Sequence, residues 1–272
     1  MGASSFSPDE LVRAMAPIEL VLQSFQSYYC EETNGSLGEC KSGQSSWVNE
    51  DAQEKFAFLL RNILKPMYID NGESIEFFPT DRYIRKVLSK FAVKVEEHSC
   101  MIESDEFAEL MMEYQMKPGS KNDSMPDPNE CCYVTFKLPI SNNSSVSRNI
   151  HHPSSDVVGI KIFPYHNDVG VRKIWEAGAA LAEFLIIRPD LIKDKSILEL
   201  GAGVGLTGIV ISGLCEPKSV HLTDYTDATL INMEHNISIN KRWIQNARGG
   251  DCVVTSVSIS AVVTLHCIIN IY

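Results

Sequence analysis

The chain has 272 residues, 44% of them hydrophobic, and a formal net charge of −11 at pH 7. This length and apolar content are typical of a soluble protein with two domains, each large enough to bury a core. The acidic balance argues against a general nucleic-acid binder and against a binder of anionic membranes, because both need a basic surface. A basic protein partner is compatible with the charge, and a simple contribution to solubility explains it as well.

The first 150 residues are expected to form a mainly helical region interrupted by polar loops. Apolar residues recur there at helical spacing, in stripes that indicate a core rather than a cofactor site. The first stripe follows a Ser-Pro-Asp-Glu sequence, which is typical of a helix start, and continues to Phe25. Four helices are expected, beginning at Ser7, Glu50, Thr80 and Ser104.

A connector and two alternating segments follow these helices. Residues 117–130, with Gly119, Pro126 and Pro128, are expected to form a flexible connector. Residues 133–138 and 157–163 alternate between apolar and polar side chains, which is typical of strands. We therefore expect a mainly helical domain over residues 1–150 and an α/β domain over residues 151–272.

The most informative stretch, SILELGAGVGLTGIVISGLCEPKSVHLTDY, covers residues 196–225. It predicts a buried parallel strand at 197–200, a glycine turn, a helix at 206–214 and a second strand at 220–223. Glycines let the backbone turn sharply and approach a ligand, because they carry no Cβ. This order of elements indicates half of a nucleotide-cofactor site.

An acid stands at the end of the second strand. It is Asp224, 23 residues after Gly201, about the spacing at which a carboxylate reaches the ribose hydroxyls of an adenosine cofactor. The helix begins directly after the glycines, and Gly208 lets it pack closely on the strand. We expect the amides at the start of this helix to be open toward the ligand.

The identity of the cofactor depends on a second acid. Gly203, Gly205 and Gly208 also satisfy the dinucleotide fingerprint G-x-G-x-x-G, which is a weak signal by itself. Glu199 and the additional Gly201 favour S-adenosylmethionine, because a carboxylate suits its ammonium and sulfonium groups and would repel a pyrophosphate. We expect both carboxylates to approach one adenosyl-sulfonium ligand from the same side. A glycine turn that binds no ligand is the remaining alternative.

Three segments carry a resemblance to a known family. They are ELGAGVGLTG at 199–208, LTDY ending at Tyr225, and IWEAG at 174–178 leading into LAEFL. Together they resemble the seven-strand protein-lysine methyltransferases called family 16, and most of all the elongation factor 2 lysine methyltransferase branch, which has an extra N-terminal domain. The resemblance implies a Rossmann-like, S-adenosylmethionine-dependent methyltransferase fold, and it is looser over the first 170 residues.

The resemblance also implies roles for particular residues. Trp175 matches a tryptophan at the family's cofactor pocket, Gly201 and Gly203 match glycines under the methionine portion, and Asp224 matches the ribose acid. No catalytic residue and no metal ligand is assigned. The expected cofactor-binding residues are Trp175, Glu199, Gly201, Ala202, Gly203, Gly205 and Asp224.

The chain departs from the family after its second strand. The family continues to a tryptophan beside the adenine and to an Asp-x-x-Tyr motif, but no tryptophan follows Trp243 and no acid follows Asp251. We therefore expect an incomplete fold with three strands in the order 3-2-1, a truncated C-terminus and doubtful activity. Residues 197–200 would then form an open sheet edge. We also expect residues 261–272 to fold back as an antiparallel strand.

Cysteine and histidine patterns indicate no metal site. The eight cysteines include no C-x-x-C pair, and the seven histidines show no ligand spacing. Cys215 and Cys252 fall in predicted core elements, so buried free thiols in a reducing compartment are expected. The expected location is the cytoplasm, since the start of the chain lacks the features of a signal peptide. The apolar tail at 252–272 is long enough to span a membrane, but its polar interruptions and valine and isoleucine content favour a strand.

Three functions remain open. The first is a protein-lysine methyltransferase with elongation factor 2 as the probable substrate. The second is a non-catalytic interaction module in which residues 1–150 bind the family's protein partner. The third is an unstable by-product. Binding of S-adenosylmethionine separates the first function from the others.

Overall fold

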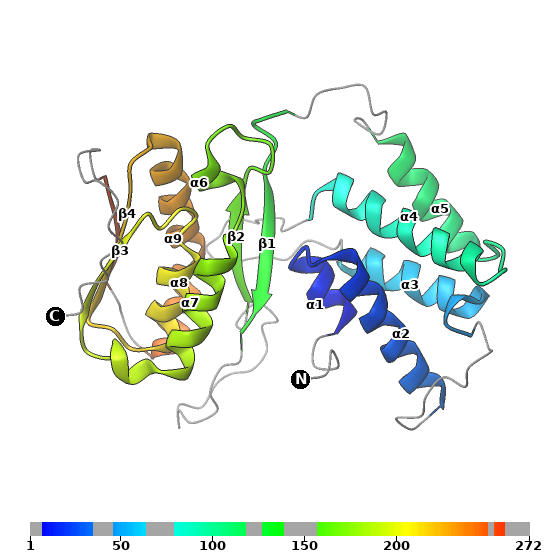
Figure 1. Cartoon of the computed structure of the whole chain (residues 1–272), viewed down its shortest axis with the longest axis horizontal. Coiled ribbons are helices and arrows are strands. Elements are labelled where there is room, and N and C mark those ends of the chain that lie inside the picture. Colours follow the sequence, from blue (N-terminus) through cyan, green and yellow to red (C-terminus); the bar gives the residue numbers. More distant parts are fainter. Residues whose placement is uncertain are drawn as a thin grey trace. The chain divides into compact units, whose positions relative to one another are not determined.

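The computed structural model describes residues 7–34, 46–63, 79–117, 127–138, 157–249 and 253–258 (Figure 1). Contacts divide these residues into two compact units. The first contains the described residues up to 117, and the second contains those from 127 onward. Each unit is treated by itself below.

The first unit is helical, as expected. Its elements are α1 (Pro8–Arg13), α2 (Ile18–Asn34), a short 3₁₀ turn (Ser46–Val48), α3 (Glu50–Ile63), α4 (Asp81–Glu97) and α5 (Asp105–Met116). The side chains of Thr80 and Ser104 accept hydrogen bonds from the amides of Tyr83 and Phe107, at 3.1 and 3.2 Å. These caps confirm the predicted starts of α4 and α5.

The first predicted helix is divided into two, which corrects the single apolar stripe expected up to Phe25. Met15 adopts a positive φ of 48°, and Pro17 follows it. Proline lacks an amide hydrogen and disfavours helical geometry in the residue before it, so the chain turns and restarts at Ile18.

Aromatic side chains build the core of the first unit. Phe56 stacks on Phe91 with ring centroids 4.0 Å apart, Phe25 contacts both rings edge-on, and Phe107 contacts Phe91 edge-on. All four rings are fully buried, and the core cluster to which they belong contains only residues of this unit.

The second unit mixes helices and strands. Its elements are β1 (Cys132–Lys137), β2 (Val157–Ile162), α6 (Val169–Arg172), α7 (Glu176–Ile187), a 3₁₀ turn (Pro189–Leu191), β3 (Ser196–Leu200), α8 (Leu206–Leu214), β4 (Ser219–Asp224), α9 (Asp227–Arg248) and β5 (Val253–Ser258). The strands, turn and helix expected between residues 196 and 225 are confirmed. The long helix α9 was not expected, although the Thr226 cap and Gly249 at its end are signals that the sequence contains.

Two sheets form in this unit. β1 and β2 pair as an antiparallel hairpin, and β3, β4 and β5 form a parallel sheet in that order. This is the order expected for the three strands. Among the described residues β3 pairs with β4 alone and lies at an edge.

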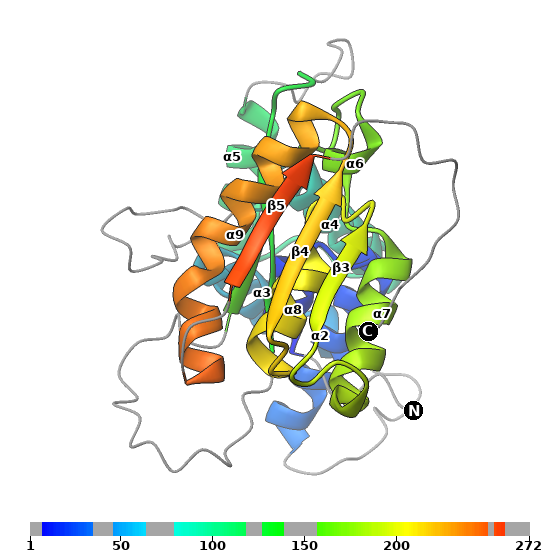
Figure 2. The ribbon, with the colours of Figure 1, turned by 90° about the vertical axis from the view of Figure 1, so that its left-hand side faces the viewer.

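The second unit has three layers. Figure 2 shows the parallel sheet with α8 and α9 behind it, and Figure 1 places the helices between that sheet and the β1–β2 hairpin. Helix α9 contacts β5 on one side and β2 on the other. The opposite face of the parallel sheet leaves Leu198 and Leu200 exposed, at 46% and 43%.

The division between the units differs from the expected boundary at residue 150. It lies near residue 125, because β1 pairs with β2 along its full length, from Cys132 opposite Ile162 to Lys137 opposite Val157. Both strands therefore belong to the second unit.

The tail was expected to form a strand followed by an antiparallel return. Residues 253–258 form a strand, whereas the return expected at 261–272 lies outside the described residues. None of the described helices has the length and apolar character that a membrane crossing requires.

Cys30 forms a disulfide bond, so the expectation of free thiols is wrong for it. Among the described residues, Cys100, Cys131, Cys132 and Cys215 are not in disulfide bonds.

Candidate functional site

The turn between β3 and α8 depends on its glycines. Gly201, Gly203 and Gly205 have φ values of 68°, 55° and 83°, in the left-handed region that other residues rarely adopt. A Cβ atom on Gly201 would meet nothing within 4 Å, so the space above this residue is open. A Cβ on Gly203 would lie 3.3 Å from the carbonyl oxygen of Gly170.

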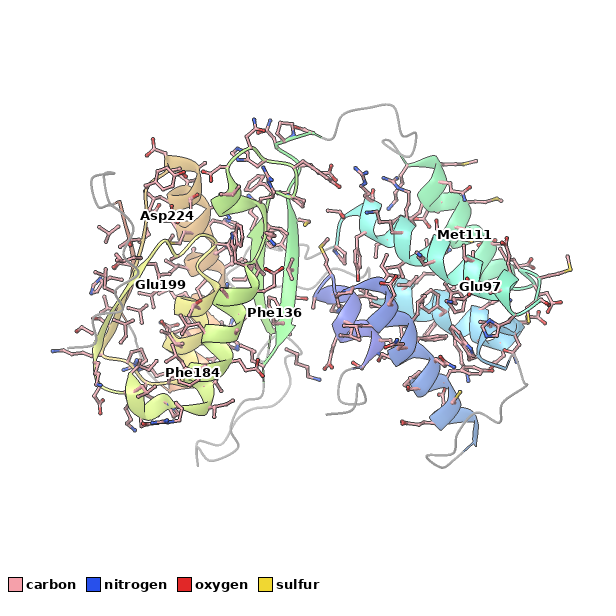
Figure 3. The ribbon with its side chains drawn as sticks, in the orientation of Figure 1. Glu97, Met111, Phe136, Phe184, Glu199 and Asp224 are labelled. Carbon is pink, nitrogen blue, oxygen red and sulfur yellow. The ribbon has the colours of Figure 1, made fainter. Side chains whose placement is uncertain are left out.

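The two predicted acids lie on one face of the sheet. Glu199 of β3 pairs with Leu222 of β4, and Asp224 stands two residues further along β4. Alternate residues of a strand point to the same face, so both side chains project to the same side as Leu222. Figure 3 labels both acids in the second unit. Glu199 and Asp224 therefore lie on the same face of the sheet, on the two strands next to the glycine turn.

Asp224 is tied to the turn itself. Its Oδ2 atom accepts a hydrogen bond from the amide of Gly203 at 3.0 Å, and its Oδ1 accepts one from the amide of Tyr225 at 2.8 Å. The residue is 9% exposed. A carboxylate has about four acceptor positions, so these two bonds leave capacity for hydroxyl donors of a ligand.

The amides of the turn are less open than expected. Besides the Gly203 amide, the amide of Ala202 donates to the carbonyl of Thr223, and the amide of Gly205 donates to that of Ala202, both at 2.9 Å. The expected open amides were those at the start of α8, and of these three only the Gly205 amide, at the N-cap of α8, belongs to that start. The amides of Ala202 and Gly203 are occupied as well, because the turn closes on itself and on β4. A phosphate needs such amides as donors, so this turn suits an anion poorly.

Glu199 is an unusual buried acid. Its Oε2 atom is buried and has no hydrogen-bond partner among the residues that the structure describes. Burial raises the pKa of this carboxyl to about 7, although the Thr207 hydroxyl and the Gly208 amide partly oppose the shift. A cation beside Glu199 would supply the missing partner and favour its charged form.

Trp175 begins the helix next to the turn. It occupies the N-cap position of α7 and is 50% exposed, with the Lys173 ammonium 4.6 Å from its ring centre. The hydroxyl of Thr207 in α8 donates to the carbonyl of Gly178 in α7 at 3.1 Å. This bond holds the first turns of α7 and α8 together, so Trp175 starts a helix anchored just after the glycine turn.

The sequence analysis missed a segment that lies over the glycine turn. Asp168 accepts hydrogen bonds from the Gly170 amide at 2.8 Å and from the hydroxyls of Thr226 and Thr229. Burial alone would raise the pKa of Asp168, but these three bonds outweigh it and lower that pKa. They tie α6 to the start of α9 and hold the Gly170 carbonyl above Gly203. An aspartate two residues before a glycine was the available signal.

A separate groove lies elsewhere in the second unit. It measures about 540 Å³, runs between α9 and β5, and is lined by residues such as Lys241, Gln245 and Thr255. None of the expected cofactor residues lines it. We locate the site by the two carboxylates and the glycine turn, because a solvent-open groove without convergent charges has no comparable chemistry. Within the described ranges, no three metal-ligating side chains come together.

Comparison with known protein families matches residues 155–250 to the family described as lysine methyltransferase. This part of the chain is similar to the family 16 lysine methyltransferases. It contains the glycine turn, both acids and Trp175, and the predicted family resemblance is thus confirmed.

Curated relatives agree with family 16. The chain is 27% identical to the protein-lysine N-methyltransferase EEF2KMT of Mus musculus over 184 residues, which are 68% of this chain and 47% of the mouse protein. It is 24% identical to EEF2KMT of Homo sapiens over 83% of this chain and 60% of the human protein. A shorter match of 65 residues is 46% identical to the protein N-terminal and lysine N-methyltransferase efm7 of Schizosaccharomyces pombe, covering 24% of this chain and 25% of that protein. The chain spans about half the length of the mouse relative.

Proposed function

We propose that the second unit binds S-adenosylmethionine at the glycine turn as the cofactor domain of a protein-lysine N-methyltransferase with a Rossmann-like fold. The observation that carries the proposal is the buried Oε2 of Glu199, which has no partner among the described residues and lies on the same sheet face as Asp224. Two carboxylates beside open space suit a ligand that has cationic groups at one end and a ribose diol at the other.

The residues present fit this cofactor better than a dinucleotide. Open space lies above Gly201, and Asp224 retains acceptor capacity for hydroxyl groups. The amides that a pyrophosphate would need are already occupied at Ala202, Gly203 and Gly205. In this proposal Glu199 attracts the cationic end, Asp224 binds the ribose, and Trp175 contributes an aromatic wall.

When bound, S-adenosylmethionine supplies the methyl group for transfer to a lysine amine. The amine must first lose its proton, and at a reference pKa near 10.4 only about one lysine in 1000 is neutral at about pH 7.4. A dry site beside a positive charge lowers this cost by depressing the amine pKa. None of the described residues is assigned to the proton transfer, so the chain's own contribution is binding and orientation.

The proposed protein substrate is elongation factor 2, by analogy with the two EEF2KMT relatives, and the proposed location is the cytoplasm. The net charge of −11 suits a basic substrate segment. That this chain itself transfers a methyl group to a lysine is likewise proposed.

Titration calorimetry tests cofactor binding. We expect the full chain at pH 8 to bind S-adenosylmethionine, and Asp224→Asn to weaken that binding by about tenfold or more, because a charge-assisted bond is lost. Asp227→Asn changes an exposed acid three residues away and should leave the affinity unchanged. No binding by the unmodified chain, or equal affinity in Asp224→Asn, would refute the proposal.

Transfer of a labelled methyl group to purified elongation factor 2 tests the reaction separately. A second candidate is an interaction module, which the exposed side chains of Leu198 and Leu200 on β3 favour. If the chain captures elongation factor 2 without transferring label, the module is the better description. If the chain transfers label to a lysine of elongation factor 2, the methyltransferase is the better description.

A further inference from the structure

Helix α9 carries asparagines whose side chains pair with backbone groups of β2. β2 pairs with β1 on one side, and its other side turns the backbone groups of Gly159 and Lys161 toward α9. The Asn240 side chain accepts from the Gly159 amide at 3.1 Å and donates to the Gly159 carbonyl at 2.7 Å. Asn236 does the same for Lys161, at 2.8 and 3.2 Å.

The spacing explains why a helix can pair with a strand edge here. Four residues along a helix rise about 6 Å, and two residues along a strand cover about 6.6 Å. Asn236 and Asn240 are therefore in register with Lys161 and Gly159. Side-chain amides resemble backbone amides in carrying both a donor and an acceptor, so each asparagine satisfies one residue of the edge.

Asn236 differs from Asn240 by one contact. Its Nδ2 also donates to the carbonyl of Val204 at 3.0 Å, within the glycine turn between Gly203 and Gly205. Asn236 is fully buried, and its three hydrogen bonds use both amide hydrogens and the oxygen. The extra donor of Asn240 goes instead to the backbone carbonyl of Asn236.

We propose that Asn236 is a positioning residue for the cofactor site, which fixes the glycine turn by joining the Val204 carbonyl to the edge of β2. The inference rests on the proposed function for its consequence in cofactor binding. Backbone amide bonds within the turn and to β4 hold its left-handed backbone, but its glycines carry no side chains that could pack against the surroundings. A buried bond to the middle of the turn therefore limits its motion and keeps Asp224 bonded to Gly203.

Asn236→Asp and Asn240→Asp form a matched pair for testing this role. Both replace a fully buried amide on α9 by a carboxyl of the same shape, and both remove donors to β2. Asn236→Asp alone removes the donor to Val204. Hydrogen–deuterium exchange of a peptide covering residues 199–208 reports opening of the turn, and calorimetry with S-adenosylmethionine reports the site.

We expect Asn236→Asp to speed exchange in this peptide about tenfold relative to Asn240→Asp, because one buried hydrogen bond is lost. We also expect Asn236→Asp to bind the cofactor about tenfold more weakly than Asn240→Asp does, although the two variants lose the same amount of thermal stability. Asn236→Ser, which introduces no buried carboxyl, is measured beside them in case Asn236→Asp does not fold.

Equal exchange in the two aspartate variants would overturn the proposal. It is equally overturned if both variants at 236 unfold while Asn240→Asp folds, because Asn236 would then be a general structural residue. Absence of cofactor binding by the unmodified chain would overturn the proposed function instead, and the exchange comparison would still decide the role of Asn236.

Discussion

Glu199 is an acid in surroundings that disfavour its charged form. A carboxyl that is buried without a full set of partners favours its protonated form. Asp168 is also partly enclosed, but it accepts hydrogen bonds from the Gly170 amide and from the hydroxyls of Thr226 and Thr229, which outweigh burial and lower its pKa. The pKa values of Glu199 and Asp168 thus shift in opposite directions because the donors around them differ.

The pKa of Glu199 predicts a pH-dependent stability. Its folded value of about 7 lies above the ordinary value of 4.5, so the folded state holds the proton more tightly. The stabilisation is complete below about pH 4.5 and is lost as the pH rises through 7, by up to roughly 3 kcal/mol. We expect Glu199→Gln to remove this part of the pH dependence and to be more stable than the unmodified chain at pH 8.

Urea unfolding at pH 5 and pH 8 measures this difference. A Trp47→Phe background restricts the tryptophan fluorescence to Trp175 and Trp243, both in the second unit. Glu183→Gln, which removes an exposed acid on α7, is the control. Parallel pH profiles for Glu199→Gln and the unmodified chain would show that burial of this carboxyl costs nothing.

At the scale of elements, α8 can approach β4 closely because Gly208 has no side chain. A Cβ atom on Gly208 would lie 2.1 Å from Cδ2 of Leu222. Leu222 is fully buried beneath the helix, so it has little room to move. The third glycine of the motif therefore serves packing between helix and sheet.

We expect Gly208→Ala to lower the free energy of unfolding of the second unit by about 1–3 kcal/mol, because overpacking outweighs the better helix propensity of alanine. Gly178→Ala is the matched control, since its Cβ would meet only the Thr207 hydroxyl, at 3.3 Å. Shortening the obstructing side chain in Gly208→Ala/Leu222→Val should restore part of the loss. A neutral or stabilising Gly208→Ala would contradict the packing argument.

At the scale of the whole molecule, the two units have separate cores. The aromatic cluster of the first unit contains only its own residues, and the cluster around Val220 and Leu222 contains only residues of the second. Each unit therefore has the apolar contacts needed for its own cooperative unfolding.

This separation predicts two transitions in a calorimetric scan. Gly208→Ala should lower one of them, which identifies the second unit. A ligand that binds only the folded second unit raises that transition by mass action, so S-adenosylmethionine should shift it and leave the other in place. A single transition, or equal shifts of both, would mean that the units unfold together.

Local patterns in the sequence were sufficient for the elements around the glycine turn. Strand periodicity, glycines and the acid at residue 224 lie within 30 residues, and they predicted β3, α8 and β4. Helix α9 was missed because its buried face mixes Asn232, Asn236 and Asn240 with apolar residues, and a search for apolar stripes detects such a mixed face poorly.

The sequence by itself determined the turn and the presence of two acids beside it, because those depend on short-range backbone geometry. Tertiary structure decided that the turn amides are occupied, that Glu199 lacks a partner among the described residues, and that Asn236 joins β2 to the turn. Asn236 bonds to groups 32 and 75 residues away. Burial and hydrogen bonding between such distant segments arise only when the layers pack, so they cannot be predicted from the spacing of residues in the sequence.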